Sequence, residues 1–363
     1  MGKRSLVAAL SIASVWFITH FGGGFSSGRQ IAEFYVQYGW FAVFMPTIAV
    51  GIIGLVYYYG WRCSVKHRVF DYRSWSNMIY RPYQKIFSNL FEAVFLVLFI
   101  TATAIAFATG GATIAKMVGT PYILNTVVIA LVIFFLTVFG AKVVRGASSA
   151  MAAIVIGGML LIYGTSIWMN HPEIVGILGS GETTEGFFPA FSKMLLYAGF
   201  QVPLIGSFVA VSDVLKTKRD VFLAAAFGFI INAAILQIST LGVLGYYPNI
   251  VSVEVPALEV AFGVEGYIPM AGDIISILIT VAVISTGVNL VYGGSRRITA
   301  WWGGGEPSLK HNIIASGIFV LITWAIGLFG LVDLVAKGYS AVGYLGWLVI
   351  IIPILYQGVR QGY

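Results

Sequence analysis

The chain has 363 residues, of which 59% are hydrophobic and only 10% are charged, and its mean hydropathy is +0.91. This composition excludes a water-soluble globular domain and indicates a protein that crosses a membrane several times. The net charge of +7 comes from basic residues between the apolar segments, so it reports topology and not nucleic-acid binding.

Ten long segments contain no Asp, Glu, Lys or Arg, and even the shortest, with 19 residues, is close to the length that crosses the hydrocarbon core. In chain order they are residues 5–28, 34–61, 93–115, 117–141, 146–172, 194–212, 221–253, 274–295, 311–332 and 338–359. We therefore predict an all-α, polytopic membrane protein of ten transmembrane helices.

Both termini are predicted to be cytoplasmic, because that orientation places most of the 21 Lys and Arg residues on the inner side. The expected location is a cell membrane, as a multi-pass protein of a prokaryotic plasma membrane. The basic start at Lys3-Arg4 is interpreted as the beginning of the first helix and not as a cleaved signal peptide. The inner loop Arg62–Lys85, which holds the single Cys63, is expected to contain a short interfacial helix.

The first apolar segment contains the sequence FGGGFSSG at Phe21–Gly28. Three consecutive glycines favour unwinding of a helix, and an unwound backbone inside a bilayer must line a cavity or a ligand. The alternative is that the glycines allow neighbouring helices to pack closely. The run predicts a discontinuous first helix.

The sixth segment contains a second interruption at Tyr197–Pro203, where Gly199 and Pro203 weaken the helix; a simple proline kink is the alternative. Gly23-Gly24-Phe25 corresponds to Ala198-Gly199-Phe200, an offset of 175 residues. Each interruption lies in the first helix of a five-helix unit, so the units 1–168 and 169–363 are predicted to be inverted repeats. Paired interruptions of this kind indicate the solute site of a secondary transporter.

The two interruptions supply complementary groups. Backbone N–H groups of Gly22, Gly23 and Gly24, with the hydroxyls of Ser26 and Ser27, are expected to attract an anionic group. Freed carbonyls at Tyr197, Ala198 and Gly199 would accept hydrogen bonds from an ammonium group. The sequence therefore predicts a zwitterionic or amine solute, with aromatic surface and a directional hydrogen bond supplied by Phe25, Tyr197, Phe200 and Gln201.

Ionisable residues at membrane depth are candidates for gating or proton transfer. Arg29 and Glu33 are four residues apart and are predicted to form an ion pair. Glu92 is interpreted either as a buried proton or cation site or as the partner of a cytoplasmic arginine. His20 has a proton role or a hydrogen-bonded structural role as its two alternatives.

The chain resembles the LeuT-fold amino acid–polyamine–organocation superfamily, in particular the YkvI-like permeases. The resemblance rests on Gly22-Gly23-Gly24-Phe25-Ser26-Ser27-Gly28 and on the five-plus-five layout. It departs from the family pattern at Arg29-Gln30, where relatives have an uncharged residue followed by an acid. The resemblance implies an outer gate at Arg29; because the tenth segment has no acid, Asp273 or Asp333 would be its partner.

The resemblance also implies a sodium site. The hydroxyls of Ser285 and Thr286 would bind the ion together with the carbonyls of Ile18, Phe21 and Ala282, and oxygen ligands suit a hard cation. Without the resemblance, the two hydroxyls would be expected to bond back to their own helix.

The functional prediction is a secondary active transporter, and not an enzyme, that moves a small amino-acid-like or amine solute by alternating access, coupled to sodium. Proton-coupled or exchange transport of an organic cation is one alternative, and a membrane sensor or receptor with a transporter-like fold is another. The expected partners are the solute, sodium or protons, and the lipid bilayer. Neither a cofactor other than the coupling ion nor a nucleic acid is expected.

Overall fold

The structure is a computed structural model that describes residues 3–300 and 308–363. These residues form helices and connecting turns with no strand, so the all-helical prediction is confirmed. In the first half the α-helices and 3₁₀ or π turns are α1 (Lys3–His20), α2 (Gly23–Ser26), α3 (Arg29–Phe34), η1 (Val36–Val43), α4 (Met45–His67), α5 (Tyr72–Ile79), α6 (Gln84–Val118), α7 (Tyr122–Phe135), η2 (Leu136–Gly140) and α8 (Ala141–Met169).

The second half begins with α9 (His171–Ser180). It continues with α10 (Phe187–Gln201), η3 (Val202–Leu204), α11 (Ile205–Val209), η4 (Ser212–Val214), α12 (Lys218–Leu244), η5 (Asn249–Ser252), α13 (Pro256–Gly263), α14 (Ala271–Ala300), α15 (Leu309–Gly327), α16 (Leu331–Asp333), η6 (Leu334–Tyr339), α17 (Ser340–Gly346), η7 (Trp347–Ile351) and α18 (Ile352–Arg360).

Seven helices in the described residues are long and apolar enough to cross a membrane, or eight if the bent pair Ala153–Met169 and His171–Ser180 counts as one span. The two segments predicted to be interrupted are not among them, since each is divided into shorter helices. A multi-pass membrane protein is therefore supported, while the count of ten spans stays a prediction.

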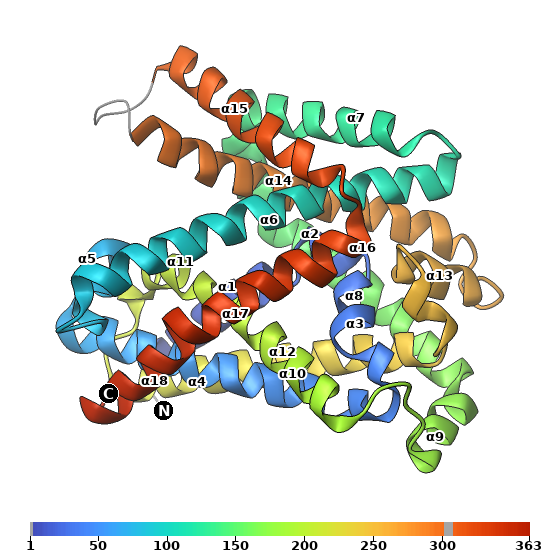
Figure 1. The fold of residues 1–363 in the computed structure, drawn as a ribbon, viewed down its shortest axis with the longest axis horizontal. Helices are drawn as coiled ribbons and strands as arrows, with labels where there is room; N and C mark the ends of the chain where they lie inside the picture. The colour runs from blue at the N-terminus through green and yellow to red at the C-terminus, as the bar shows by residue number, and fades with distance from the viewer. Residues whose placement is uncertain (1–2, 301–307) are drawn as a thin grey trace.

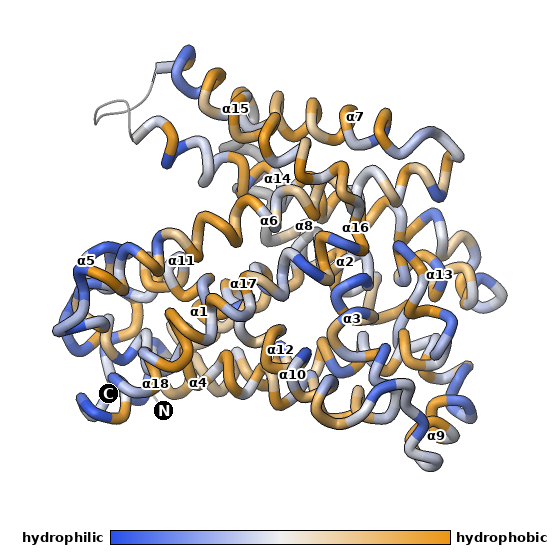
Figure 2. The backbone as a smooth tube through the Cα atoms, in the orientation of Figure 1, coloured by the Kyte–Doolittle hydropathy of each residue, from blue (hydrophilic) through white to orange (hydrophobic). Residues whose placement is uncertain are grey.

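The long helices lie roughly along one direction, with polar stretches at both ends (Figures 1 and 2). Both termini and α5 lie at one end, whereas α9 and α13 lie at the other (Figure 1). Helix α14 packs against α6, α8 and α15, and α12 packs against α1 and α4. The short helix α2 lies between these groups in contact with α14 and α6, so the interrupted first segment occupies the centre of the protein.

Two short helices at the ends of the molecule follow from local sequence. The loop after α4 contains α5, whose N-cap Asp71 accepts a hydrogen bond from the Ser74 N–H at 2.7 Å. The loop after α12 contains α13, which begins at Pro256, a residue suited to the first turn of a helix. That loop folds back onto the interrupted segment, because the Ala257 N–H donates to the Ser27 carbonyl at 2.9 Å.

Candidate functional site

The first segment leaves the helical conformation at two glycines. α1 ends at His20, and Gly22 is extended, with φ −73° and ψ −171°. A single turn, α2, follows, and the chain then turns at Gly28, where φ is +75°. Gly28 requires glycine because of this left-handed conformation and because a Cβ there would lie 2.9 Å from the Ala257 nitrogen.

The extended backbone at Gly22 brings the end of α1 against α14. A Cβ at Gly22 would lie 3.0 Å from Thr286 Oγ1, so these two residues are in direct contact. The last turn of α1 includes Ile18, and the last carbonyls of a helix have no partner within it. The break therefore places helix-end carbonyls beside the hydroxyl side of α14.

A cavity of about 320 Å³ lies at this break. Its lining comes from α1, α2, α3, α6, α8, α10, η3, α14 and η6. All five residues of the expected sodium site line it: Ile18, Phe21, Ala282, Ser285 and Thr286. Residues far apart in sequence thus meet at one cavity. This juxtaposition is what cation binding would need.

The predicted solute residues divide into two groups. Those that line the cavity are Gly22, Gly24, Phe25, Phe200 and Gln201. Gly23 is the first residue of α2. Those outside the lining are Ser26, Ser27, Tyr197, Ala198 and Gly199, all of them buried.

The Ser27 hydroxyl is used within its own turn. It donates to the Gly24 carbonyl at 3.0 Å and accepts from the Arg29 N–H at 3.2 Å. Ser27 therefore stabilises the turn between α2 and α3 rather than facing the cavity.

The prediction of freed carbonyls is wrong for Tyr197 and Ala198, whereas the Gly199 carbonyl lies four residues before Pro203, which has no N–H to donate. α10 continues to Gln201, and the Ala198 carbonyl accepts the N–H of Val202. The irregular turn comes later, at Val202–Leu204, where Pro203 removes a backbone donor.

Gly199 is a point of close packing between helices, a role that the sequence suggested only for the glycines of the first segment. A Cβ at Gly199 would lie 2.2 Å from the Gly343 carbonyl oxygen, and a Cβ at Gly346 would lie 1.9 Å from the Gly199 oxygen. The glycine that suggested a break is therefore the point where α10 meets α17 and the turn after it.

His20 lies in a buried polar chain beside the cavity. Its Nδ1 is 2.7 Å from Asn232 Oδ1 and its Nε2 is 2.8 Å from the Tyr197 hydroxyl. The Asn232 amide nitrogen donates to the Gly228 carbonyl, so Oδ1 is the acceptor and His20 Nδ1 carries a proton. In a neutral imidazole, Nε2 then accepts from Tyr197.

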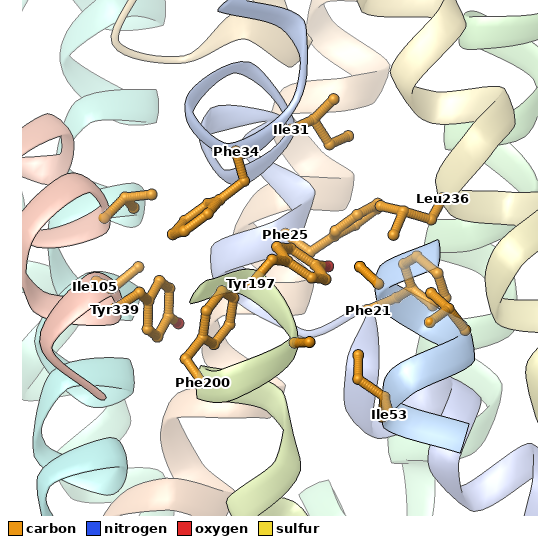
Figure 3. Close-up of a cluster of buried hydrophobic side chains, with 14 of the residues drawn as sticks. Phe21, Phe25, Ile31, Phe34, Ile53, Ile105, Tyr197, Phe200, Leu236 and Tyr339 are labelled. Carbon is orange, nitrogen blue, oxygen red and sulfur yellow. The ribbon is translucent and has the colours of Figure 1, made fainter. Parts of the chain in front are cut away.

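Aromatic rings form a buried layer around the break (Figure 3). Phe200 stacks on Tyr339 with ring centroids 4.2 Å apart and planes 11° apart. Phe21 meets Phe25 edge to face at 4.4 Å, and Tyr197 meets Phe200 at 4.9 Å. The cavity is thus bounded on one side by aromatic surface from three segments of the chain.

Gln30 and Tyr339 line the cavity but were not among the predicted site residues. Gln30 is 4% exposed, and its Oε1 is buried without a hydrogen-bond partner. Its Nε2 would lie 2.8 Å from a Cβ at Gly24, and the Tyr339 hydroxyl 3.2 Å from the same point. Gln30 could have been suspected from its place two residues after Gly28, whereas no sequence signal marks Tyr339.

A charged cluster lies on the α13 side of the cavity. Arg29, which is 1% exposed, pairs with Glu33 at 3.0 Å and donates to the carbonyls of Val251 and Val253 at 2.7 and 2.9 Å. Lys193 of α10 pairs with the other Glu33 oxygen at 2.7 Å. The predicted Arg29–Glu33 pair is therefore present, and Lys193 is an addition that sequence reasoning missed.

Neither of the two acids expected to pair with Arg29 is its partner among the described residues. Asp333 pairs with Lys337 at 2.7 Å on an exposed surface, and Asp273 is exposed in the first turn of α14. The physical reason is that Glu33 lies one helical turn from Arg29 and already supplies the negative charge.

Glu92 pairs with Arg297 of α14. The guanidinium also lies 4.6 Å from the centre of the Phe95 ring and 5.7 Å from that of Phe99, which lines the cavity. Of the two roles proposed for Glu92, pairing with an arginine is the one that the geometry favours.

The arrangement of helices in this chain is similar to that in several solved structures. Mhp1 in an inward-facing conformation aligns with a TM-score of 0.63 and 14% identity over 94% of this chain and 75% of that one. MhsT in complex with L-phenylalanine aligns with a TM-score of 0.59 and 11% identity over 99% and 87%. The Eremococcus coleocola manganese transporter in complex with an aromatic bis-isothiourea substituted compound aligns with a TM-score of 0.58 and 15% identity. The alignment covers 98% of this chain and 80% of that one.

The chain has the LeuT fold. Neighbours with this fold are transporters and not enzymes, and one of them is a Na⁺-coupled sialic acid symporter, at a TM-score of 0.51 and 11% identity. Identities this low show the fold alone. No family model matches the chain, and neither does any curated protein.

Proposed function

We propose that the protein is a secondary active transporter that moves a small amino-acid-like or amine solute by alternating access, with sodium as the coupling ion. The observation that carries the proposal is the single cavity at the break in the first segment. It is lined by all five expected ion ligands and by five of the eleven expected solute residues. We further propose that the protein is a member of the amino acid–polyamine–organocation superfamily, close to the YkvI-like permeases. This proposal rests on the glycine motif at Gly22–Gly28.

The class of solute follows from the unpaired acceptor. A buried carbonyl oxygen without a partner costs free energy, about 1–3 kcal/mol, which a bound donor would recover. Gln30 Oε1 is such an atom, and it lies near aromatic surface formed by Phe200 and Tyr339. An ammonium or other N–H group attached to an apolar body satisfies both features.

The ion site is supported by the donor set. Carbonyl oxygens at the break and hydroxyl oxygens of α14 are suitable for a hard monovalent cation, and the Gly22–Thr286 contact places the break, which caps α2, against α14. An ion at this place would bind only while the break stays against α14. It would therefore favour one conformation of the transporter over another.

Helix contacts support the proposed inverted repeats, 1–168 and 169–363. The first helix of the first unit packs against the second helix of the other unit, α1 on α12. Likewise, α10 packs on α4. The third and fourth helices pack together in each unit, α6 on α7 and α14 on α15. This exchange of partners is what an approximate two-fold relation would produce.

Uptake into proteoliposomes tests the function. With an inward sodium gradient and a panel of amino acids and amines, we expect at least one solute to accumulate, and accumulation to stop when a sodium ionophore is added. Combined Ser285→Ala and Thr286→Ala should abolish the sodium dependence. Thr280→Ala on the same helix, where the hydroxyl bonds back to the Ser276 carbonyl, should leave it unchanged. No accumulation of any solute under a sodium or proton gradient would contradict the proposal.

A proton-coupled transporter of an organic cation is the second candidate, and the His20 chain is the observation that favours it. His20 connects Asn232 to Tyr197 next to the cavity, so a proton on Nε2 would reverse the Tyr197 hydrogen bond. His20→Gln should then remove pH-driven uptake while Ser285→Ala has no effect. Sodium coupling predicts the opposite result for these two variants.

A further inference from the structure

A second hollow, of about 620 Å³, lies where the inner loop meets the start of α6. It is lined only by basic and amide side chains: Arg73, Asn77, Arg81, Gln84, Lys85 and Asn89. It is formed by α5, the turn after it and the first two turns of α6, so it is separate from the transport cavity.

The cationic groups of this hollow carry positive charge that no acid neutralises. Among the ion pairs formed within residues 3–300 and 308–363, none includes Arg73, Arg81 or Lys85. The Arg73 guanidinium is instead held by neutral acceptors, Asn89 Oδ1 at 2.7 Å and the Ser88 carbonyl at 3.4 Å. A guanidinium positioned in this way is prepared for an anion, and arginine matches phosphate oxygens particularly well.

The hollow also contains an unsatisfied acceptor. Gln84 Oε1 is buried without a hydrogen-bond partner. A phosphodiester group alone has no proton to donate to it, but a phosphodiester that carries a hydroxyl-bearing alcohol can donate. These two features, cations without an acid partner and one acceptor without a donor, fit a phosphodiester with a polyol headgroup.

Apolar side chains border the same place. On α6, Ile86 is 61% exposed and Leu90, one turn later, is 42% exposed, immediately beside Lys85 and Asn89. Helix α6 has 35 residues, or about 52 Å at 1.5 Å per residue, which exceeds the hydrocarbon thickness of about 30 Å. Its first turns therefore reach the headgroup layer, with a polar hollow on one side and an apolar stripe on the other.

We propose that this hollow binds an anionic glycerophospholipid with a hydroxyl-bearing headgroup, of the phosphatidylglycerol kind. The phosphate lies against Arg73, Arg81 and Lys85, the headgroup hydroxyl donates to Gln84, and an acyl chain runs along Ile86 and Leu90. Basic pockets at the cytoplasmic surface of membrane helices bind acidic headgroups through this chemistry. The density of positive charge in the loop places it on the cytoplasmic side.

Lipid binding to the purified full chain tests the proposal, measured by native mass spectrometry with dioleoyl phosphatidylglycerol and with phosphatidylcholine of the same chains. We expect at least tenfold preference for phosphatidylglycerol. Combined Arg73→Gln, Arg81→Gln and Lys85→Gln should lose it. The matched triple Lys218→Gln, Arg219→Gln and Lys310→Gln removes as much charge from other exposed inner positions and should keep the preference within twofold.

Two further arms distinguish a lipid from a soluble anion. Inorganic phosphate and glycerol 3-phosphate should compete only weakly, and Ile86→Gln with Leu90→Gln should weaken lipid binding at least threefold. If glycerol 3-phosphate binds as tightly as the lipid, the site takes a soluble anion and the proposal is overturned. The proposal would also be overturned if the two lipids bound equally well, or if both triple variants lost the preference for phosphatidylglycerol to the same extent. Should the first triple variant not fold, the Ile86 and Leu90 variant and the salt sensitivity of the native chain decide.

Discussion

Gln30 is the residue at which the proposed solute site is most sharply defined. We expect Gln30→Leu to weaken solute binding about tenfold to a hundredfold, because a hydrogen bond to a charged partner contributes about 1.5–3 kcal/mol. The measurement is a thermal-shift titration, which gives the solute concentration at which half of the maximal rise in unfolding temperature is reached. Asn312→Leu, an amide removed at the start of α15 away from the cavity, is the control. A Gln30→Leu protein with native solute affinity would exclude Gln30 from the site.

Glu254 provides a test of electrostatics outside the membrane-spanning helices. Burial raises the pKa of its carboxyl, although the Leu331 N–H and Arg29 act against that shift. Ionised Glu254 therefore costs stability in full at pH values above its raised pKa. The cost shrinks as the pH falls below that pKa and disappears below the ordinary value of 4.5, where the carboxyl is protonated in the folded and unfolded states alike.

The expected outcome is that Glu254→Gln raises the unfolding temperature at pH 7.5 and that the difference from the native protein narrows on acidification. The gain should be small, below about 1 kcal/mol, because the side chain is partly exposed. Glu173→Gln on the exposed helix α9 controls for loss of one negative charge. A gain that widens toward low pH would have the wrong sign and would reject this explanation.

At the scale of elements, the contact between α10 and α17 is set by backbone meeting backbone. Gly199→Ala should strongly reduce the yield of folded protein, because the new methyl group meets the Gly343 carbonyl and only separation of the helices would relieve the overlap. Overpacking of this kind costs typically about 1–3 kcal/mol or more. Gly157→Ala has open space around it and should behave like the native protein. Size-exclusion profiles of fluorescent fusions compare the two, and equal profiles would show that α10 and α17 are not in contact.

The buried cluster of α3 and α10 gives a second test at this scale. Glu33→Gln leaves Arg29 and Lys193 without their acid, and breaking a buried pair costs about 3–5 kcal/mol. Asp333→Asn is the matched control, because Asp333 and Lys337 have the same four-residue spacing but are 57% and 80% exposed. Its effect should be below about 1 kcal/mol. Thermal unfolding in detergent measures both, and similar losses would mean that burial does not determine the strength of these pairs.

The differences between sequence and structure show which properties are local. Helix content and the unwinding at Gly22 depend on nearby residues, so hydropathy and the glycine run were enough to predict them. The role of Gly199 depends on Gly343, 144 positions later in the chain, and no local pattern distinguishes a packing glycine from a breaking one. The same holds for Tyr339 and Lys193, whose functional surroundings exist only after the helices have packed.

At the scale of the whole molecule, burial differs between the two sides of the cavity. Ser26, Ser27 and Arg29 are buried beneath the loop that precedes α13, while Thr19 lines the cavity and is exposed. Since α13 lies at the end opposite to the termini (Figure 1), we expect access from the side of α5 and the termini. With cytoplasmic termini, as the basic residues predict, this conformation faces inward.

Thiol labelling tests this orientation, and the chain suits it because its one cysteine, Cys63, is buried. In a Cys63→Ser background, Thr19→Cys should react with a membrane-impermeant maleimide in inside-out vesicles but not in right-side-out vesicles, and solute with sodium should slow the reaction. Ser27→Cys should be protected on both sides until the protein turns outward. Labelling of Ser27→Cys but not of Thr19→Cys in the absence of solute would mean that the resting protein opens at the α13 end. The cavity would then be filled from the opposite side of the membrane.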